Sequence, residues 1–262
     1  MNLVKYNLSN YIPELIDFIG EEKFPWDDVE KKYDRKIDQR VSETNGDSIV
    51  IEASIFDQII SIKKGDSDYI GMMDFYNKLF YQLKLLLNQE ERKLIFNTIK
   101  NLLIAFDSKY LNYLGELSVI YQLKKTNNFI LLEVEKVLPN GKSIDFDMMI
   151  QDSKMRVLIE VMNIQINPKK VENDANSIRT FINGRLEEKM TDKKKNLIDD
   201  WNIHLVPIIW GGHEQLEIYN EYFKTNSTDL PLCYVPLAFL TYFDQNGNYF
   251  PKFGSISTLF DS

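Results

Sequence analysis

Acidic side chains interrupt two short segments that otherwise have the composition of buried β-strands, and they limit what this part of the chain can fold into. The segments read "SIDFDMMI" and "MRVLIEVMN", and the turn-like "QDSK" separates them. A charged group that leaves water without a partner loses several kcal/mol of solvation. Buried carboxylates therefore need basic partners or a bound cation. The alternative is a sheet with one solvent-exposed face, which a polar residue at every second position ordinarily indicates.

Strand register decides whether the carboxylates meet. Folding the two strands as an antiparallel hairpin about residues 152–153 sets Asp145 opposite Glu160, and Asp147 lies one step along the same face. Directly opposed residues on such a pair have Cβ atoms about 5 Å apart. Two carboxylates at that distance raise each other's pKa and attract a divalent cation, which prefers oxygen ligands. We therefore expect a metal site at this place.

A salt bridge is the competing explanation for these carboxylates. The basic residues on the two strands and their turn are Lys154 and Arg156. Both lie several positions from Asp145, so the register favours a metal over a salt bridge.

Residues 110–211 read as a series of helix, three strands, helix and strand. Apolar spacing predicts a first helix that ends in a basic turn, alternation and turn residues mark the strands, and a long helix with one apolar stripe follows. This order predicts an α/β fold. The segments are helix 108–128, strands 129–138, 144–150 and 155–163, helix 176–201 and strand 203–212.

Residues 1–109 and 212–262 are predicted to flank this core. The first region is mainly helical by its apolar spacing, with one strand candidate, "DSIVIEASIF", at 47–56. The second holds a helix at 214–223 and a hairpin at 237–253, whose "NG" is a turn signal. We interpret its "DQNGN" as a turn rather than a calcium loop, because the acidic residue that closes such a loop is missing.

The composition limits which partners the protein can bind and in which cellular compartment it is expected. The formal net charge of -8 over 262 residues repels nucleic acid at long range, so a nucleic acid partner needs a local basic surface or bound cations.

The one cysteine, Cys233, cannot form an intramolecular disulfide, and no basic-then-apolar leader opens the chain, so we expect a reducing cytoplasm. No apolar run reaches the roughly 20 residues that cross a bilayer, and no membrane partner is expected.

In its series of elements, residues 110–211 resemble the core of the PD-(D/E)xK, or restriction-endonuclease-like, nucleases. Glu116 in "YLGELSVIYQL" matches the glutamate of that family's first helix. Asp145 in "SIDFD" matches the aspartate of its second strand, and Glu160 in "IEVMN" matches the first position of Glu-x-Lys on its third.

The resemblance implies metal-assisted hydrolysis of a phosphodiester, with Mg²⁺ or Mn²⁺ as the cofactor. Asp145, Glu160 and the carbonyl of Val161 are the implied ligands. Asp147 is a further ligand candidate, and Glu116 is expected to hold a second ion through water.

The lysine of Glu-x-Lys is missing, because its position holds Met162. In the resembled family this lysine helps to activate the attacking water, and it is known to move to a neighbouring element. Lys189 and Lys193 recur with Arg185 every fourth residue along one side of the long helix, and we choose Lys189 as the displaced lysine. An ordinary solvated helix face is the alternative for all three.

We expect a metal-dependent endonuclease that acts on nucleic acid, with DNA ranked before RNA as its substrate. The sequence leaves the choice between DNA and RNA and the oligomeric state open, a homodimer included. The alternative is a catalytically degenerate protein of the nuclease fold that binds nucleic acid or a partner protein without cutting, and Met162 supports it. A structural or interaction role of the helical N-terminal region agrees with the acidic net charge. The sequence has no Gly-rich phosphate loop, no nucleophile elbow and only two histidines, which disfavours other hydrolytic chemistries.

Overall fold

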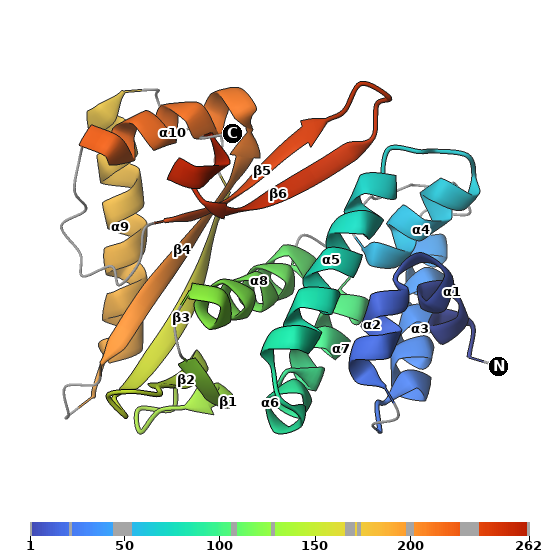
Figure 1. Ribbon diagram of the computed structural model, residues 1–262, viewed down its shortest axis with the longest axis horizontal. Coiled ribbons are helices and arrows are strands. Elements are labelled where there is room, and N and C mark those ends of the chain that lie inside the picture. The colour runs from blue at the N-terminus through green and yellow to red at the C-terminus, as the bar shows by residue number, and fades with distance from the viewer. Residues whose placement is uncertain are drawn as a thin grey trace. The chain divides into compact units, whose positions relative to one another are not determined.

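The computed structural model describes residues 2–20, 23–43, 54–105, 109–126, 129–165, 171, 174–197, 202–225 and 236–260. The chain forms two compact units, each described by itself below. The first consists of Met1–Tyr121 with Phe243–Phe250, and the second of Gln122–Tyr242 with Pro251–Ser262 (Figure 1).

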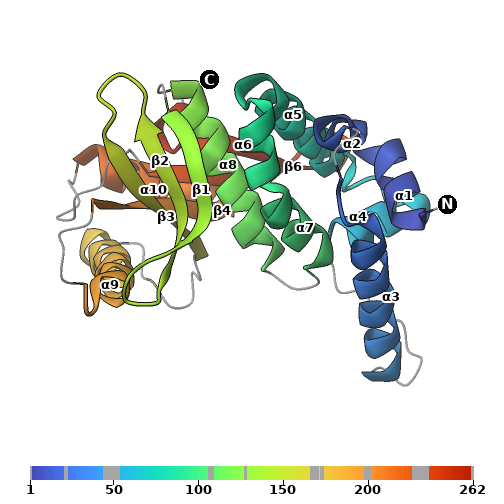
Figure 2. The ribbon, with the colours of Figure 1, turned by 90° about the horizontal axis from the view of Figure 1, so that it is seen from below.

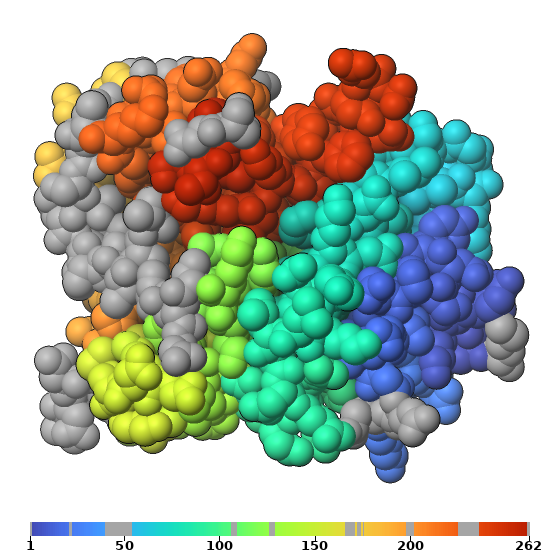
Figure 3. All heavy atoms as spheres, in the orientation of Figure 1, coloured from blue at the N-terminus to red at the C-terminus, as the bar shows by residue number. Residues whose placement is uncertain are grey.

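The first unit is built mainly of helices, as its apolar spacing predicts. Side chains of α5 and α6 form much of the visible surface of this unit in Figure 3. The helices are α1 (Leu3–Tyr11), α2 (Pro13–Ile19), α3 (Trp26–Glu43), α4 (Ile55–Lys63), α5 (Ile70–Leu86), α6 (Gln89–Leu94), α7 (Phe96–Ile104) and the first part of α8 (Tyr110–Thr126).

The strand candidate at 47–56 is wrong in the part that the structure describes. Residues 47–53 lie outside the described residues, whereas Ile55 and Phe56 open helix α4. The Ser54 side chain accepts a hydrogen bond from the backbone N–H of Asp57 and caps this helix. An N-cap serine satisfies one of the free N–H groups of the first turn, and here it outweighs the β propensity of the residues that follow.

The second unit contains most of a six-stranded sheet in the order β1-β2-β3-β4-β5-β6, and the tip of the β5–β6 hairpin belongs to the first unit. The sheet and its helices place the chain in the α/β class. β1, β2 and β3 pair antiparallel, while β3, β4 and β5 pair parallel. Figure 2 shows β1, β2 and β3 side by side. The strands are β1 (Phe129–Val137), β2 (Ser143–Ile150), β3 (Arg156–Gln165), β4 (Ile203–Gly212), β5 (Leu237–Phe243) and β6 (Tyr249–Ser255).

Helices α9 (Ala175–Lys194) and α10 (His213–Thr225) pack with β3, β4 and β5 in one apolar core. Parallel neighbours need such crossovers, because a tight turn cannot return the chain to the same end of the sheet. A short 3₁₀ turn, Ser257–Leu259, contributes to the same core. The core residues of the two helices and of β3 and β4 are Ile178, Ile182, Leu186, Leu216, Tyr219, Tyr222, Met162, Ile164, Leu205 and Ile209.

Two hairpins have the turns that the sequence predicts. In the β2–β3 hairpin the pairs run from Phe146 with Ile159 to Met149 with Arg156, which centres the turn on residues 152–153 and confirms the predicted register. In the β5–β6 hairpin the Asp244 carboxylate accepts hydrogen bonds at 2.8 Å from two backbone N–H groups of the turn. "DQNGN" is therefore a turn.

The predicted division at 109/110 and 211/212 does not coincide with the division into compact units. α8 begins at Tyr110 but has residues in both units, and β5 adds to the sheet of the predicted core. No helix within the described ranges is long and apolar enough to span a bilayer.

Candidate functional site

The sheet forks between β2 and β3, and the two predicted carboxylates lie at the fork. β2 stays paired with β1 as far as Ser143, and β3 stays paired with β4 as far as Gln165. The ladder between β2 and β3, however, ends at Phe146 with Ile159. Asp145 and Glu160 are the next opposed residues in this register, so they stand where the two strands part.

Asp145 bridges the fork to the backbone of β3. Its carboxylate Oδ2 accepts a hydrogen bond of 2.7 Å from the N–H of Val161. In a continued ladder that N–H would have faced β2, and a buried N–H without an acceptor is costly. The carboxylate therefore replaces a missing ladder bond and is itself held in a fixed orientation.

Burial, and then the charge of Glu160, raise the pKa of Asp145 from 3.8 to about 7. The Val161 N–H and the ammonium groups of Lys193 and Lys189 act in the opposite direction without overcoming these two effects. Near neutral pH the Asp145 carboxyl thus holds a proton in part of the molecules when no cation is bound.

This pKa predicts how stability depends on pH in a chelator such as EDTA. Between about 4 and about 7 the folded protein keeps a proton on Asp145 that the unfolded chain has lost, so the free energy of unfolding should fall as the pH rises and level off above about 7. Asp145→Asn keeps an acceptor for Val161 and should remove this part of the slope. Urea unfolding of both proteins at several pH values measures the difference, and parallel curves would contradict the expectation.

Glu160 is almost completely buried and carries two ion pairs on one oxygen. The ammonium nitrogens of Lys189 and Lys193 lie 2.7 and 2.9 Å from its Oε1. Its other oxygen, Oε2, is buried and has no hydrogen-bond partner among the described residues. Buried polar atoms are nearly always paired, so this oxygen can accept a further ligand.

Helix α9 places both lysines by means of its apolar stripe. Ile178, Ile182 and Leu186 pack in the core beside β3, and Lys189 and Lys193 continue the same side of the helix one and two turns further on. Burial lowers the pKa of Lys189, but the hydrogen bond and charge of Glu160 outweigh it and raise the pKa overall. Both lysines therefore belong to the site, whereas sequence reasoning chose only one.

Arg185, the third basic residue of this series, lies apart from the carboxylates. Its side chain is half exposed and forms a 3.7 Å ion pair with Glu188 on the same helix. It fits the solvated-face alternative, which does not fit Lys189 and Lys193.

Met162 is part of the apolar core and not of the polar site. It is 5% exposed and clusters with Ile164 of β3 and with Ile178, Ile182 and Leu186 of α9. An ammonium at this position would enter that cluster, where an unpaired charge is expensive. The positive charge instead comes from Lys189 and Lys193 in the C-terminal part of α9, whose apolar residues pack with Met162.

Asp147 lies outside the carboxylate pair, in an ion-pair cluster of its own. It is fully buried, accepts two hydrogen bonds from the guanidinium of Arg156 and lies 2.9 Å from the ammonium of Lys136. Hydrogen bonds to Glu133 and Asp147 raise the pKa of Lys136. The salt bridge that competes with a metal is thus formed at Asp147, with Arg156 as one partner, and a second one is formed at Glu160 with the two lysines of α9. The expected ligand role of Asp147 has no support in this geometry.

The expected metal-binding roles of two further groups, on Glu116 and Val161, stay predictions. Glu116 is half buried on α8 in the first unit, and its position relative to the pair is not described. Val161 contributes its N–H to Asp145, while the expected role of its carbonyl as a ligand stays a prediction.

The donor set suits a hard divalent cation. Asp145 and Glu160 supply carboxylate oxygens, which are the ligands that Mg²⁺ and Mn²⁺ prefer. Oε2 of Glu160 has no hydrogen bond among the described residues, and the charge of Glu160 contributes to the raised pKa of Asp145, so a cation at the pair would gain a ligand and relieve their repulsion. In the described part of the chain no third carboxylate, imidazole or thiol joins them, so water or backbone oxygens would complete the coordination.

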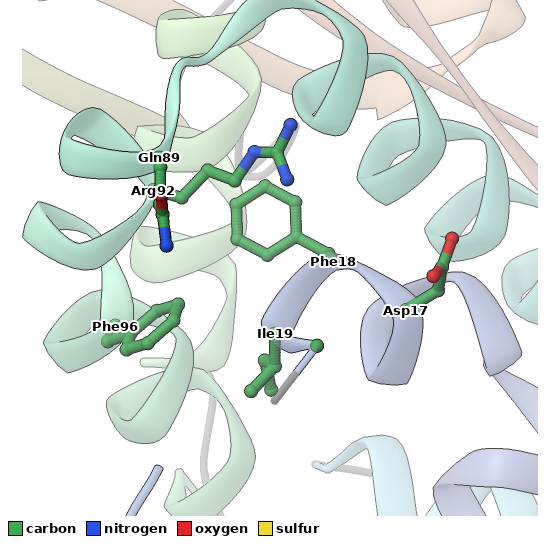
Figure 4. A pocket seen from close by; sticks show the side chains of 7 residues that line it. Asp17, Phe18, Ile19, Gln89, Arg92 and Phe96 are labelled. Carbon is green, nitrogen blue, oxygen red and sulfur yellow. The ribbon is translucent and has the colours of Figure 1, made fainter. Parts of the chain in front are cut away.

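The first unit contains a separate pocket of about 460 Å³. Figure 4 shows Arg92 and Phe18 in it, with the guanidinium carbon 5.8 Å from the centre of the ring. The Arg92 guanidinium donates to the carbonyls of Lys84 and Leu87, so its role there is to fix the chain. None of the residues predicted from the sequence lines this pocket.

Comparison of the chain with models of known protein families, with curated proteins and with solved structures finds no match.

Proposed function

We propose that this protein is a Mg²⁺- or Mn²⁺-dependent endonuclease that hydrolyses phosphodiester bonds in DNA, with a core of the restriction-endonuclease-like type. The observation that carries the proposal is the contact of Lys189 with Glu160 beside Asp145, at the fork between β2 and β3. The site thus combines two carboxylates with a half-exposed ammonium, and these are the groups that cation-assisted attack of water on a phosphodiester requires.

Each side chain has a distinct task in this proposal. Asp145 and Glu160 would hold the cation, which supplies charge to polarise the phosphate and to lower the pKa of a water molecule. The Val161 N–H keeps Asp145 in place. The side chain of Lys189 is 37% exposed, so its ammonium is accessible to a phosphate and to the attacking water. The side chain of Lys193 is largely buried.

A cleavage assay tests the proposal. Wild-type protein is incubated with Mg²⁺ or Mn²⁺ and with mixed single- and double-stranded DNA and RNA, beside Asp145→Ala and Glu160→Gln. The matched controls are Asp152→Ala in the exposed β2–β3 turn and Glu188→Gln on the exposed side of α9. Cleavage that needs the cation and both site carboxylates, but neither control residue, supports the proposal. A wild type that cuts nothing contradicts it.

Cation binding should also stabilise the folded protein. Mg²⁺ or Mn²⁺ relieves the repulsion between Asp145 and Glu160 and binds only the native pair, which at 100 times the dissociation constant adds about 2.7 kcal/mol. Melting curves should therefore shift upward with the cation in wild type and in Asp152→Ala, but not in Asp145→Ala. The same shift in all three would place the ion elsewhere.

A second candidate has one observation in its favour. The charges of Lys189 and Lys193 balance those of Asp145 and Glu160 without any cation. A nuclease fold that binds nucleic acid or a partner protein without cutting would keep such a neutral cluster. Cation-independent retention of DNA without cleavage, measured by gel shift, would select this candidate over the enzyme.

A further inference from the structure

The turn between β1 and β2 holds the end of α9 that carries the two lysines. The Asn140 side-chain amide donates hydrogen bonds of 2.9 and 2.8 Å to the carbonyls of Lys193 and Lys195. The last carbonyls of a helix have no partner within the helix, so Asn140 supplies donors that α9 itself cannot. Its Oδ1 accepts the N–H of Lys142, which fixes the amide within the turn.

Two further contacts join the same turn to α9. The Lys142 ammonium lies 2.6 Å from Oδ1 of Asp192, the residue before Lys193. The Lys193 ammonium donates to the carbonyl of Ser143, the first residue of β2. The helix end is therefore attached to the start of β2 through backbone and side chains.

Lys193 joins the two strands that part at the fork. Its ammonium contacts the Ser143 carbonyl on β2 and Glu160 on β3, and its side chain is only 10% exposed. Lys189 has one of these two contacts and greater exposure. The lysines thus differ in role, because Lys193 fixes the strands and Lys189 keeps an accessible ammonium.

We propose that Asn140 is a positioning residue of the carboxylate site, which acts through the backbone of Lys193 to keep both lysines on Glu160. This role rests on the proposed nuclease function for its catalytic consequence. Asn140 is uncharged, so its replacement changes the placement of the lysines without changing the charge of the site. Misplacement of a catalytic group by about 1 Å can reduce a rate about 100-fold.

A double-mutant cycle tests the placement without any assay of activity. Denaturant unfolding is measured for wild type, Asn140→Ala, Glu160→Gln and the double variant. Asn140 and Glu160 share Lys193 as a partner, so their effects should not add. We expect Asn140→Ala to lower the unfolding midpoint clearly less in the Glu160→Gln background than in wild type. The same cycle with Asn176→Ala, at the other end of α9, should be additive.

Cleavage kinetics test the consequence for the reaction. Asn140→Ala should lower kcat by about tenfold or more while KM for DNA stays within about twofold, since the site is misplaced and the substrate surface is kept. Asn140→Ser, which retains one donor, should recover part of kcat, and it serves as the second variant if the alanine protein does not fold.

The outcomes separate the two proposals. An additive cycle, or an unchanged kcat in a folded Asn140→Ala protein, overturns the positioning role. A wild type without cleavage overturns the proposed nuclease function instead, and the stability cycle alone then decides whether Asn140 holds the lysines on Glu160.

Discussion

Lys189→Ala should abolish most cation-dependent cleavage, with a fall in rate of about 100-fold or more, while the protein stays folded. A positioned group that transfers a proton or stabilises developing charge contributes about 10²–10⁴ in rate. Lys193 remains on Glu160 in this variant, and Lys189 is partly exposed, so the free energy of unfolding should change by about 1 kcal/mol or less. Single-turnover cleavage and urea unfolding measure the two effects.

Arg185→Ala is the matched control for this substitution. Arg185 lies one helical turn before Lys189 and pairs with Glu188 rather than with the site. It should retain wild-type cleavage. Full activity in Lys189→Ala would show that the attacking water is activated by another group, and equal losses in both variants would indicate a general electrostatic effect of α9 on DNA binding.

Replacing Lys136 and Arg156 together by methionine should lower the free energy of unfolding by about 3–5 kcal/mol. Asp147 is fully buried, and removing both cations leaves its charge without compensation. Each single substitution should cost much less, since the other cation remains and Arg156 is more than half exposed. Urea unfolding at neutral pH gives the three values.

A triple variant separates structure from chemistry at this cluster. Adding Asp147→Leu to the double variant removes the buried charge, so most of the lost stability should return. Because Asp147 lies outside the carboxylate pair, cleavage should also remain. Stability that returns without cleavage would restore Asp147 to the list of metal ligands.

Much of this site could be predicted from the order and register of the strands. The turn at residues 152–153 is encoded locally, and the side-chain period of two then determines that Asp145 and Glu160 oppose each other. The α9 stripe is likewise encoded by helical spacing, which is why Lys189 could be chosen from the sequence.

The partners of the carboxylates could be predicted only in part, because they come from other elements. Lys136 reaches Asp147 from β1, and the register of β1 shifts between Leu131 and Glu133, where a bulge breaks the simple alternation. Lys193 was visible by its spacing from Lys189, but its second contact depends on how closely the start of β2 approaches α9. No local signal in the sequence reports such distances.

The prediction from local sequence was wrong where a helix cap decides the structure. Residues 55–56 follow a sequence segment rich in residues of high β propensity, yet they form the first turn of α4, which Ser54 caps. Propensity is a weak prior that tertiary context and capping override.

The ammonium groups are carried on α9 and the carboxylates on the sheet, so the geometry of the site depends on how the helix packs on β3. Ile182 and Leu186 belong to that apolar contact, one to three turns before Lys189 and Lys193. A substitution that changes side-chain volume in this contact should therefore shift the ammonium groups relative to Glu160, even though it touches neither substrate nor cation. Met162 packs in the same cluster, so its identity should affect the site through helix packing rather than through charge.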